Sequence, residues 1–182
     1  MGAMLWVLLL GPVQAAEEKG TDDGGPATAE QQAIVRALSV RHGAPACVDL
    51  GSLSADLVAD LVWVADHVQY PPWVGLRAAS CVVTAFPDAG APALVRWASS
   101  PDTRGLAILI TSKLDGVPDA TAISVAEALV CGPWRDDLRG RLSGHPLAEI
   151  RALSAASTVS SPSAEGGPEK EEASPCANVG SR

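Results

Sequence analysis

Asp60, Trp63 and His67 are the residues of this 182-residue chain whose types and spacing could best support chemistry. They stand at positions i, i+3 and i+7, which places them on one side of a helix. A histidine near a carboxylate can act as a general base, so Asp60 and His67 could serve a small hydrolase or lyase. Tryptophan is enriched at interaction hot spots, so the same three residues could instead bind a partner. The structural alternative, which we favour, is that Trp63 packs on a neighbouring helix while Asp60 and His67 meet solvent.

Trp97 is the fourth candidate binding residue. Like Trp73 and Trp134, it stands at or near the end of an expected helix. An exposed row of tryptophans would suit contact with a peptide or a glycan. A chain with one Phe and one Tyr, however, needs large side chains to fill the gaps between its helices. Core packing of these tryptophans is therefore the favoured alternative.

The motifs of common enzymes and metal sites are missing from the sequence. No serine lies in a GxSxG turn, and the glycines fall in turns and linkers rather than in a phosphate-binding loop. The adjacent Asp136 and Asp137 stand at the start of an expected helix, where acidic side chains interact favourably with the helix dipole. We therefore expect no catalytic residues, no cofactor and no metal, and a chain that is not an enzyme.

The four cysteines are Cys47, Cys81, Cys131 and Cys176. An even number permits two disulfides in an oxidising compartment, with three possible pairings. No two of them form a CxxC pair, and no cysteine–histidine cluster has the spacing of a zinc site. We expect a Cys47–Cys81 bridge from the loop after the first helix to the middle of a later one, stabilising the fold by about 3–4 kcal/mol. Cys131 is the rival partner, and Cys176 could remain free or pair with another molecule.

The first residues resemble an export signal. Residues 4–13, MLWVLLLGPV, form an apolar core that is too short to span a bilayer. Val13 and Ala15 supply the small residues that precede a cleavage site, so residues 1–15 are predicted to be a signal peptide. No other segment is apolar enough for a membrane span, and the expected location is periplasmic or extracellular. Because MGAM at the start contains no lysine or arginine, an intracellular protein with an uncleaved N-terminal helix and reduced cysteines is the alternative.

Composition divides the rest of the chain into three parts. Residues 16–27 are acidic and glycine-rich and are expected to be a flexible leader, and residues 157–182 have the same character and are expected to be a disordered tail. Residues 28–156 are then the folded domain, which is nearly neutral although the whole chain carries a net charge of −8. Because no basic stripe is present, binding to nucleic acid is not expected.

The folded domain is predicted to be all α-helical. Aromatic residues make up only 4% of the chain, so alanine, leucine and valine must build a core of closely packed helices. Thr28 and Gln31 fit a capping box, Ser52 or Ser54 could cap the next helix, and residues 71–72, both proline, suit the first turn of a third. About eight helices joined by short turns are expected, and no alternating run is long enough for a sheet.

Residues 75–83, GLRAASCVV, place an arginine and a cysteine inside one of these helices. Helical spacing puts Ala78 and Cys81 on the buried side and Arg77 on its flank. Arg77 is therefore expected to reach a carboxylate or the end of a neighbouring helix. We interpret the segment as a closely packed helix and not as a chemical site.

Three segments resemble HEAT repeats, in which a proline and an arginine accompany alanines in the second helix. They are PPWVGLRAASCVV, SPDTRGLAILITSKL and HPLAEIRALSAA, and the resemblance covers residues 54–156. Ala79 and Ala107 anchor the first two 28 residues apart, which is shorter than the ~40 residues of this class. The resemblance implies a short right-handed stack of antiparallel helix pairs that binds another protein through a concave face, without catalysis. An irregular helical bundle is the alternative fold.

These patterns together favour an exported, non-enzymatic module, either structural or protein-binding, whose partner is expected to be another protein. The alternative function is a small hydrolase or lyase that uses His67 and Asp60.

Overall fold

The computed structural model describes residues 26–156 and Cys176, and that part of the chain contains α-helices and 3-10 helices but no strand. The predicted all-α class is therefore confirmed. The expected signal peptide, almost all of the leader and, apart from Cys176, the tail lie outside the described residues. The α-helices are α1 (Ala29–Ser39), α2 (Leu57–His67), α3 (Pro72–Ala85), α4 (Ala91–Ser99), α5 (Arg104–Lys113), α6 (Asp119–Cys131), α7 (Arg135–Leu142) and α8 (Ala148–Ala156), and the 3-10 helices are η1 (Cys47–Leu53), η2 (Pro101–Thr103) and η3 (Leu114–Gly116).

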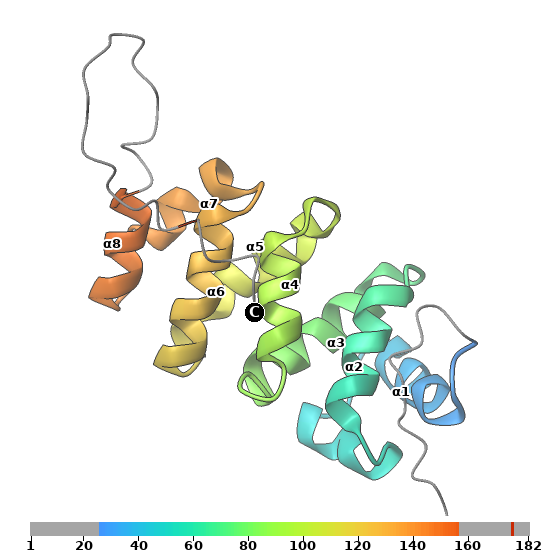
Figure 1. The fold of residues 1–182 in the computed structure, drawn as a ribbon. Helices are drawn as coiled ribbons and strands as arrows, with labels where there is room; N and C mark the ends of the chain where they lie inside the picture. The colour runs from blue at the N-terminus through green and yellow to red at the C-terminus, as the bar shows by residue number, and fades with distance from the viewer. Residues whose placement is uncertain (1–25, 157–175, 177–182) are drawn as a thin grey trace, which may run out of the picture.

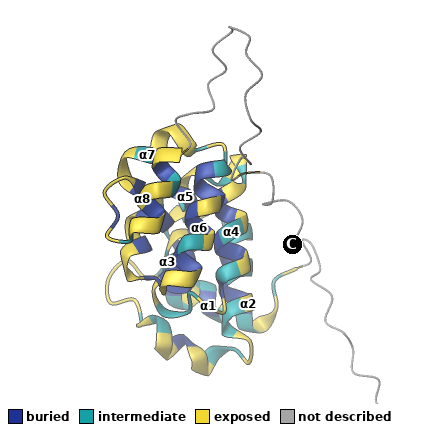
Figure 2. Cartoon of the chain, turned by 60° about the vertical axis from the view of Figure 1, so that its left-hand side comes forward, coloured by how far each residue is buried: buried dark blue, intermediate teal, exposed yellow. Residues whose placement is uncertain are grey.

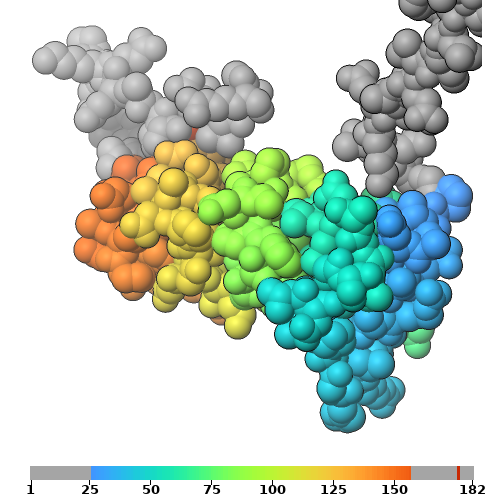
Figure 3. All heavy atoms as spheres, turned by 90° about the horizontal axis from the view of Figure 1, so that it is seen from below, coloured from blue at the N-terminus to red at the C-terminus, as the bar shows by residue number. Residues whose placement is uncertain are grey.

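The helices follow one another along one direction, from α1 at one end to α8 at the other (Figure 1, Figure 3). One series of contacts joins α1 to α3, α3 to α5 and α5 to α7, and a second joins α4 to α6 and α6 to α8. Successive helices such as α2 and α3, or α4 and α5, connect the two series. None of the described helices is both long and apolar enough to cross a bilayer. The right-handed, HEAT-like stack remains a prediction.

Two of the expected helix starts lie where the local sequence signals put them. Thr28 Oγ1 accepts a hydrogen bond from the Gln31 N–H at 3.1 Å, and Gln31 Oε1 accepts one from the Thr28 N–H at 2.9 Å. These reciprocal bonds are the predicted capping box of α1. Pro72 opens α3, where its missing N–H has no helical partner to lose.

The start of α2 differs from the sequence prediction. Asp56, and neither Ser52 nor Ser54, caps this helix, since its Oδ1 accepts a hydrogen bond from the Ala59 N–H at 3.2 Å. The Ser54 hydroxyl instead donates to Oδ2 of Asp60 at 2.6 Å. Oγ of Ser54 also accepts a hydrogen bond from the Asp56 N–H at 3.0 Å, so Ser54 binds the residue before α2 and not an N–H of its first turn.

Aliphatic and small side chains fill the space between the helices, and the exposed residues lie on the outside (Figure 2). Ala78 and Ala79 in α3 are fully buried, as the close packing of this helix requires. The tightest approach to backbone atoms is at Gly132, after α6, where a Cβ would lie 2.8 Å from the Ala128 carbonyl oxygen and 2.9 Å from that of Ala98. The ends of α4 and α6 therefore meet backbone to backbone.

Arg77 connects α3 to the end of α1. Its Nη1 donates to the carbonyl oxygen of Leu38 at 2.7 Å and also to that of Val40, and its Nη2 donates to that of Arg41 at 3.2 Å. The last carbonyls of a helix have no partner within the helix. The arginine of GLRAASCVV is therefore a structural residue that reaches a neighbouring helix end, as the sequence indicates.

Two disulfides join the described cysteines. Cys47, at the start of η1, is bonded to Cys81 of α3, which is the pair expected from the sequence. Cys131, the last residue of α6, is bonded to Cys176. The expectation that Cys176 stays free or pairs with another molecule is corrected by this second bond, which also removes Cys131 as a partner for Cys47.

Candidate interaction surface

Asp60 is a buried structural carboxylate. Only 2% of its surface is exposed, and its Oδ1 accepts a hydrogen bond of 3.0 Å from Nε2 of Gln31 in α1. Its Oδ2 accepts the bond from Ser54 before α2. Both oxygens are occupied, so Asp60 ties α1 to α2 and presents no free carboxylate to a substrate or partner. This placement corrects the sequence expectation that Asp60 meets solvent.

Trp63 and His67 form a local stack on α2. Their ring centroids lie 4.8 Å apart with an angle of 16° between the planes, and Nδ1 of His67 lies 2.9 Å from the carbonyl oxygen of Trp63. His67 is exposed and Trp63 is half-buried. No ion pair joins His67 to a carboxylate of the described residues. Asp60 and His67 are therefore not assembled as an acid–base pair.

Trp97 lies in the core and not on a surface. None of its surface is exposed, and its indole N–H donates to Oδ1 of Asp66 in α2 at 2.6 Å. Arg96 also binds Asp66, with Nη2 2.6 Å from Oδ2. The assignment of Trp97 as a binding residue is corrected by this burial, and the Arg96–Asp66–Trp97 group instead joins α4 to α2.

Trp73 and Trp134 make the same contact at two places in the fold. Each indole N–H donates to a backbone carbonyl oxygen 34 positions earlier: Trp73 to Ser39 at 3.4 Å and Trp134 to Ser100 at 3.0 Å. Both acceptors stand at the end of a helix, α1 and α4 respectively. These half-buried tryptophans satisfy helix ends and fill gaps between helices, so they do not form an exposed aromatic row.

His145 is a buried histidine that the sequence did not single out. It is 5% exposed, and its Nδ1 accepts a hydrogen bond from the Leu147 N–H at 3.1 Å, just before α8. Oδ1 of Asp115 lies 3.1 Å from Nε2, within ion-pair distance but outside hydrogen-bond geometry. The only feature of the sequence that marks His145 is its position directly before Pro146, and this position does not predict whether the histidine is buried or exposed.

The four candidate residues from the sequence, Asp60, Trp63, His67 and Trp97, therefore each contact another residue of the fold. No three histidine, cysteine or acidic residues in that part of the chain gather closely enough to hold a metal ion. The salt bridge between Arg104 and Asp137, at 2.9 Å, lies on the surface.

Exposed apolar side chains mark one such surface on α3 and α5. Leu76 on α3 is 44% exposed and Ile108 on α5 is 37% exposed, and these two helices contact each other. Leu76, Ser80 and Thr84 repeat every four positions along α3, as Ile108 and Ser112 do along α5, so each set shares one helix side. We call the surface formed by Leu76, Ser80, Thr84, Ile108, Ser112 and Lys113 the α3–α5 face.

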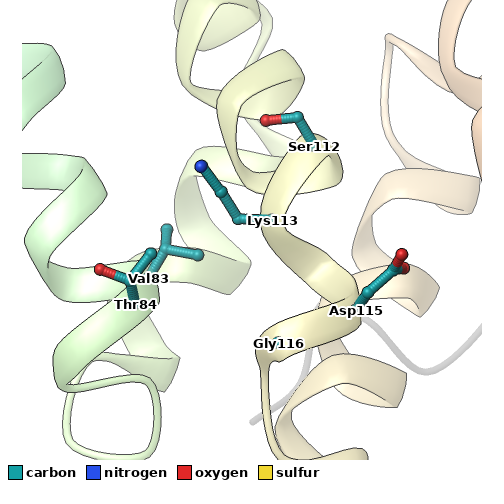
Figure 4. Close-up of a pocket in the computed structure, with 6 residues that line it drawn as sticks. All are labelled: Val83, Thr84, Ser112, Lys113, Asp115 and Gly116. Atoms are coloured by element: carbon teal, nitrogen blue, oxygen red, sulfur yellow. The ribbon is translucent and has the colours of Figure 1, made fainter.

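A hollow of about 320 Å³ lies at one end of the α3–α5 face. It is lined by the last turns of α3 and α5 and by η3, through Val83, Thr84, Ser112, Lys113, Asp115 and Gly116 (Figure 4). Lys113 extends from α5 toward α3, whereas Asp115 points to the other side (Figure 4). As the last residue of α5, Lys113 places its charge where the helix dipole favours a cation. Thr84 and Ser112 line the same hollow, so the exposed sides of the two helices belong to one continuous surface.

Comparison of the chain with protein families, with curated proteins and with solved structures finds no match.

Proposed function

We propose that this protein is an exported, non-enzymatic interaction module and that it binds another protein through the α3–α5 face. One observation carries the proposal. Leu76 and Ile108 are both exposed on two contacting helices, while Asp60 and Trp97 are buried and bonded within the fold. Exposed apolar residues that gather on one surface are typical of protein-binding sites.

The two disulfides support the exported part of this proposal. Disulfides persist in oxidising compartments and are rare where thiols are kept reduced. The apolar segment of residues 4–13 would supply the export signal. Intact-mass measurement of the native chain tests this: we expect a mass that begins at Ala16 and a gain of hydrogen on reduction that corresponds to two disulfides. A chain that retains residues 1–15 and carries reduced cysteines would contradict export.

The resemblance to HEAT repeats supports the protein-binding part. The two series of helix contacts are what stacked helix pairs would produce, and such stacks bind other proteins along one face. The α3–α5 face lies on the series that contains α1, α3, α5 and α7, which is where we expect the partner.

Site-specific photo-crosslinking in the native cells tests the proposed surface. A photoreactive phenylalanine analogue replaces Leu76 in one variant and Ile108 in a second, and Ser124, which is exposed on α6, is replaced in the control. We expect the same protein to be crosslinked from positions 76 and 108 and not from position 124. Crosslinks from position 124 alone, or none from positions 76 and 108, would refute the α3–α5 face as the binding surface.

A further inference from the structure

The two disulfides differ in how accessible their sulfurs are. Cys81 is 4% exposed and belongs to the hydrophobic core, and Cys47 packs against that core. Cys131 is half-buried at the end of α6, and Cys176 is exposed. An attacking thiolate must reach a sulfur atom, so the exchange of a disulfide depends on access. Cys47 and Cys131 are both half-buried, so the exposed Cys176 makes Cys131–Cys176 the more accessible of the two bonds to an external thiol.

The two disulfides also differ in what they hold together. Cys47–Cys81 joins η1 to the middle of α3, and both elements belong to the packed helical domain. Cys131–Cys176 joins the end of α6 to a residue that lies beyond α8, the last described α-helix. Next to this end of α6, Trp134 donates to the carbonyl of Ser100 without involving either cysteine, and α6 also contacts α4, α7 and α8. We therefore expect the contacts between the helices to remain when Cys131–Cys176 opens.

From these two differences we propose that Cys131–Cys176 is an exchangeable disulfide and that Cys176 is a site of covalent modification by an external thiol. The attacking thiolate forms a new bond to Sγ of Cys176, and the bond between the two cysteine sulfurs breaks. Sγ of Cys131 leaves with the electron pair and takes a proton from water. The products are a mixed disulfide at Cys176 and a free thiol at Cys131, so no separate oxidant or reductant is consumed. A second thiol that attacks the external sulfur of the mixed disulfide would release Cys176 as a thiol.

This proposal does not depend on the α3–α5 face, because it concerns a disulfide at the end of α6 and not a binding surface. It predicts a chain with one permanent and one exchangeable crosslink. Residue 176 is covalently bonded to the end of α6 while the disulfide is closed, and this covalent link is lost after exchange.

Reduced glutathione is the probe for the test. The full chain is incubated with increasing glutathione under native conditions, free thiols are blocked with iodoacetamide, and intact mass and peptide mapping locate the modifications. We expect the mass of one glutathione on Cys176, one blocked thiol on Cys131, and a Cys47–Cys81 bond that remains closed. The far-ultraviolet circular dichroism spectrum is expected to stay unchanged throughout.

Two variants keep the test decisive. In a Cys131→Ser, Cys176→Ser double variant, we expect the same circular dichroism spectrum as the wild type and no glutathione adduct at the same concentrations. In a Cys47→Ser, Cys81→Ser double variant, exchange at Cys176 is still expected if the chain folds. Opening of Cys47–Cys81 before or together with Cys131–Cys176, a glutathione adduct confined to Cys131, or exchange that begins only when the helices unfold would each overturn the proposal.

Discussion

At the scale of single residues, Arg77 shows how one side chain can complete a neighbouring helix. Its guanidinium donates to carbonyl oxygens of three residues at the end of α1. Hydrogen bonds made by a charged donor contribute more than neutral ones, and their loss leaves acceptors without partners. Substitution of Arg77 is therefore expected to lower stability more than its partial exposure would indicate.

We predict that Arg77→Met lowers the free energy of unfolding by about 1–3 kcal/mol, because methionine keeps much of the apolar stem but none of the donors. Arg36→Met is the matched control, since Arg36 is exposed on α1 and forms no hydrogen bond or ion pair with another described residue. It should change the same quantity by no more than about 0.5 kcal/mol. Urea denaturation followed by circular dichroism measures both, and equal effects of the two substitutions would show that the bonds to α1 contribute nothing.

Asp60 and His67 are predicted to have unequal effects on stability. Asp60→Ala leaves the amide of Gln31 and the hydroxyl of Ser54 without their acceptor in a buried site, and we expect a loss of about 2 kcal/mol in the free energy of unfolding. His67→Ala removes an exposed ring and should cost no more than about 0.5 kcal/mol. Thermal and urea unfolding of the two variants measure the difference. An unchanged free energy of unfolding in Asp60→Ala would contradict the structural role of this carboxylate.

Residue roles could be predicted from the sequence where they follow from local spacing. The flank position of Arg77 and the buried side of Cys81 follow from helical periodicity, and the structure bears out both. The burial of Asp60 and Trp97 could not be read in the same way, because it depends on partners far away in the chain, Gln31 and Asp66 respectively. A periodic pattern identifies one helix side but does not say which other helices cover it.

At the scale of elements, the ends of α4 and α6 meet at Gly132. Its φ of −83° is available to any residue, so the requirement for glycine is steric. A Cβ at this position would contact the carbonyl oxygens of Ala128 and Ala98, and neither backbone atom can turn away as a flexible side chain could. The two helices can approach this closely only while residue 132 has no side chain.

We predict that Gly132→Ala lowers the free energy of unfolding by about 1–3 kcal/mol, as added volume does in a well-packed core. Gly140→Ala is the control, because Gly140 lies within α7 and a Cβ there meets nothing within 4 Å. Alanine favours the helix over glycine, so this change should raise stability by up to about 1 kcal/mol. Denaturant titration measures the change in the free energy of unfolding for both variants. No change in Gly132→Ala would show that α4 and α6 can move apart without loss of stability.

Helix starts were predictable where the signal is short-range. The capping box of Thr28 and Gln31 and the proline at the start of α3 are complete within a few residues, and both act as expected. The start of α2 was mispredicted because Ser54 Oγ accepts a hydrogen bond from the Asp56 N–H, before the helix, and donates to Asp60, while Asp56 itself accepts from the Ala59 N–H. The sequence also predicted a loop where the structure has the 3-10 helix η1. This helix is joined to α3 by the disulfide of Cys47.

At the scale of the whole molecule, the all-α class followed from composition because so few aromatic residues require alanine and aliphatic side chains to build the core. The buried set bears this out, since Trp97 is the only aromatic residue among the fully buried large side chains of the described chain. The order in which helices contact one another could not be derived from composition, because it depends on long-range contacts such as those of Trp73 and Trp134 with earlier helix ends.

The contact between α3 and α5 leads to a prediction for the α3–α5 face. Leu76 is 44% exposed and Ile108 is 37% exposed, so more than half of each side chain is buried and an aspartate at either position removes part of the buried apolar area. We predict that Leu76→Asp and Ile108→Asp each lower the free energy of unfolding by about 1–2 kcal/mol and leave the chain folded. If a protein partner covers this face, the same changes place a charge in an apolar contact and must weaken binding.

The measurement combines each substitution with the photoreactive residue at the other position. Crosslinking from position 108 is expected to disappear in Leu76→Asp, and crosslinking from position 76 is expected to disappear in Ile108→Asp, while Ser124→Asp on α6 leaves both intact. Because the two positions lie on different helices, loss of both crosslinks in variants that circular dichroism shows to be folded would require one partner that spans α3 and α5. Crosslinks that survive both substitutions would mean that the exposed apolar residues of these helices do not form a binding surface.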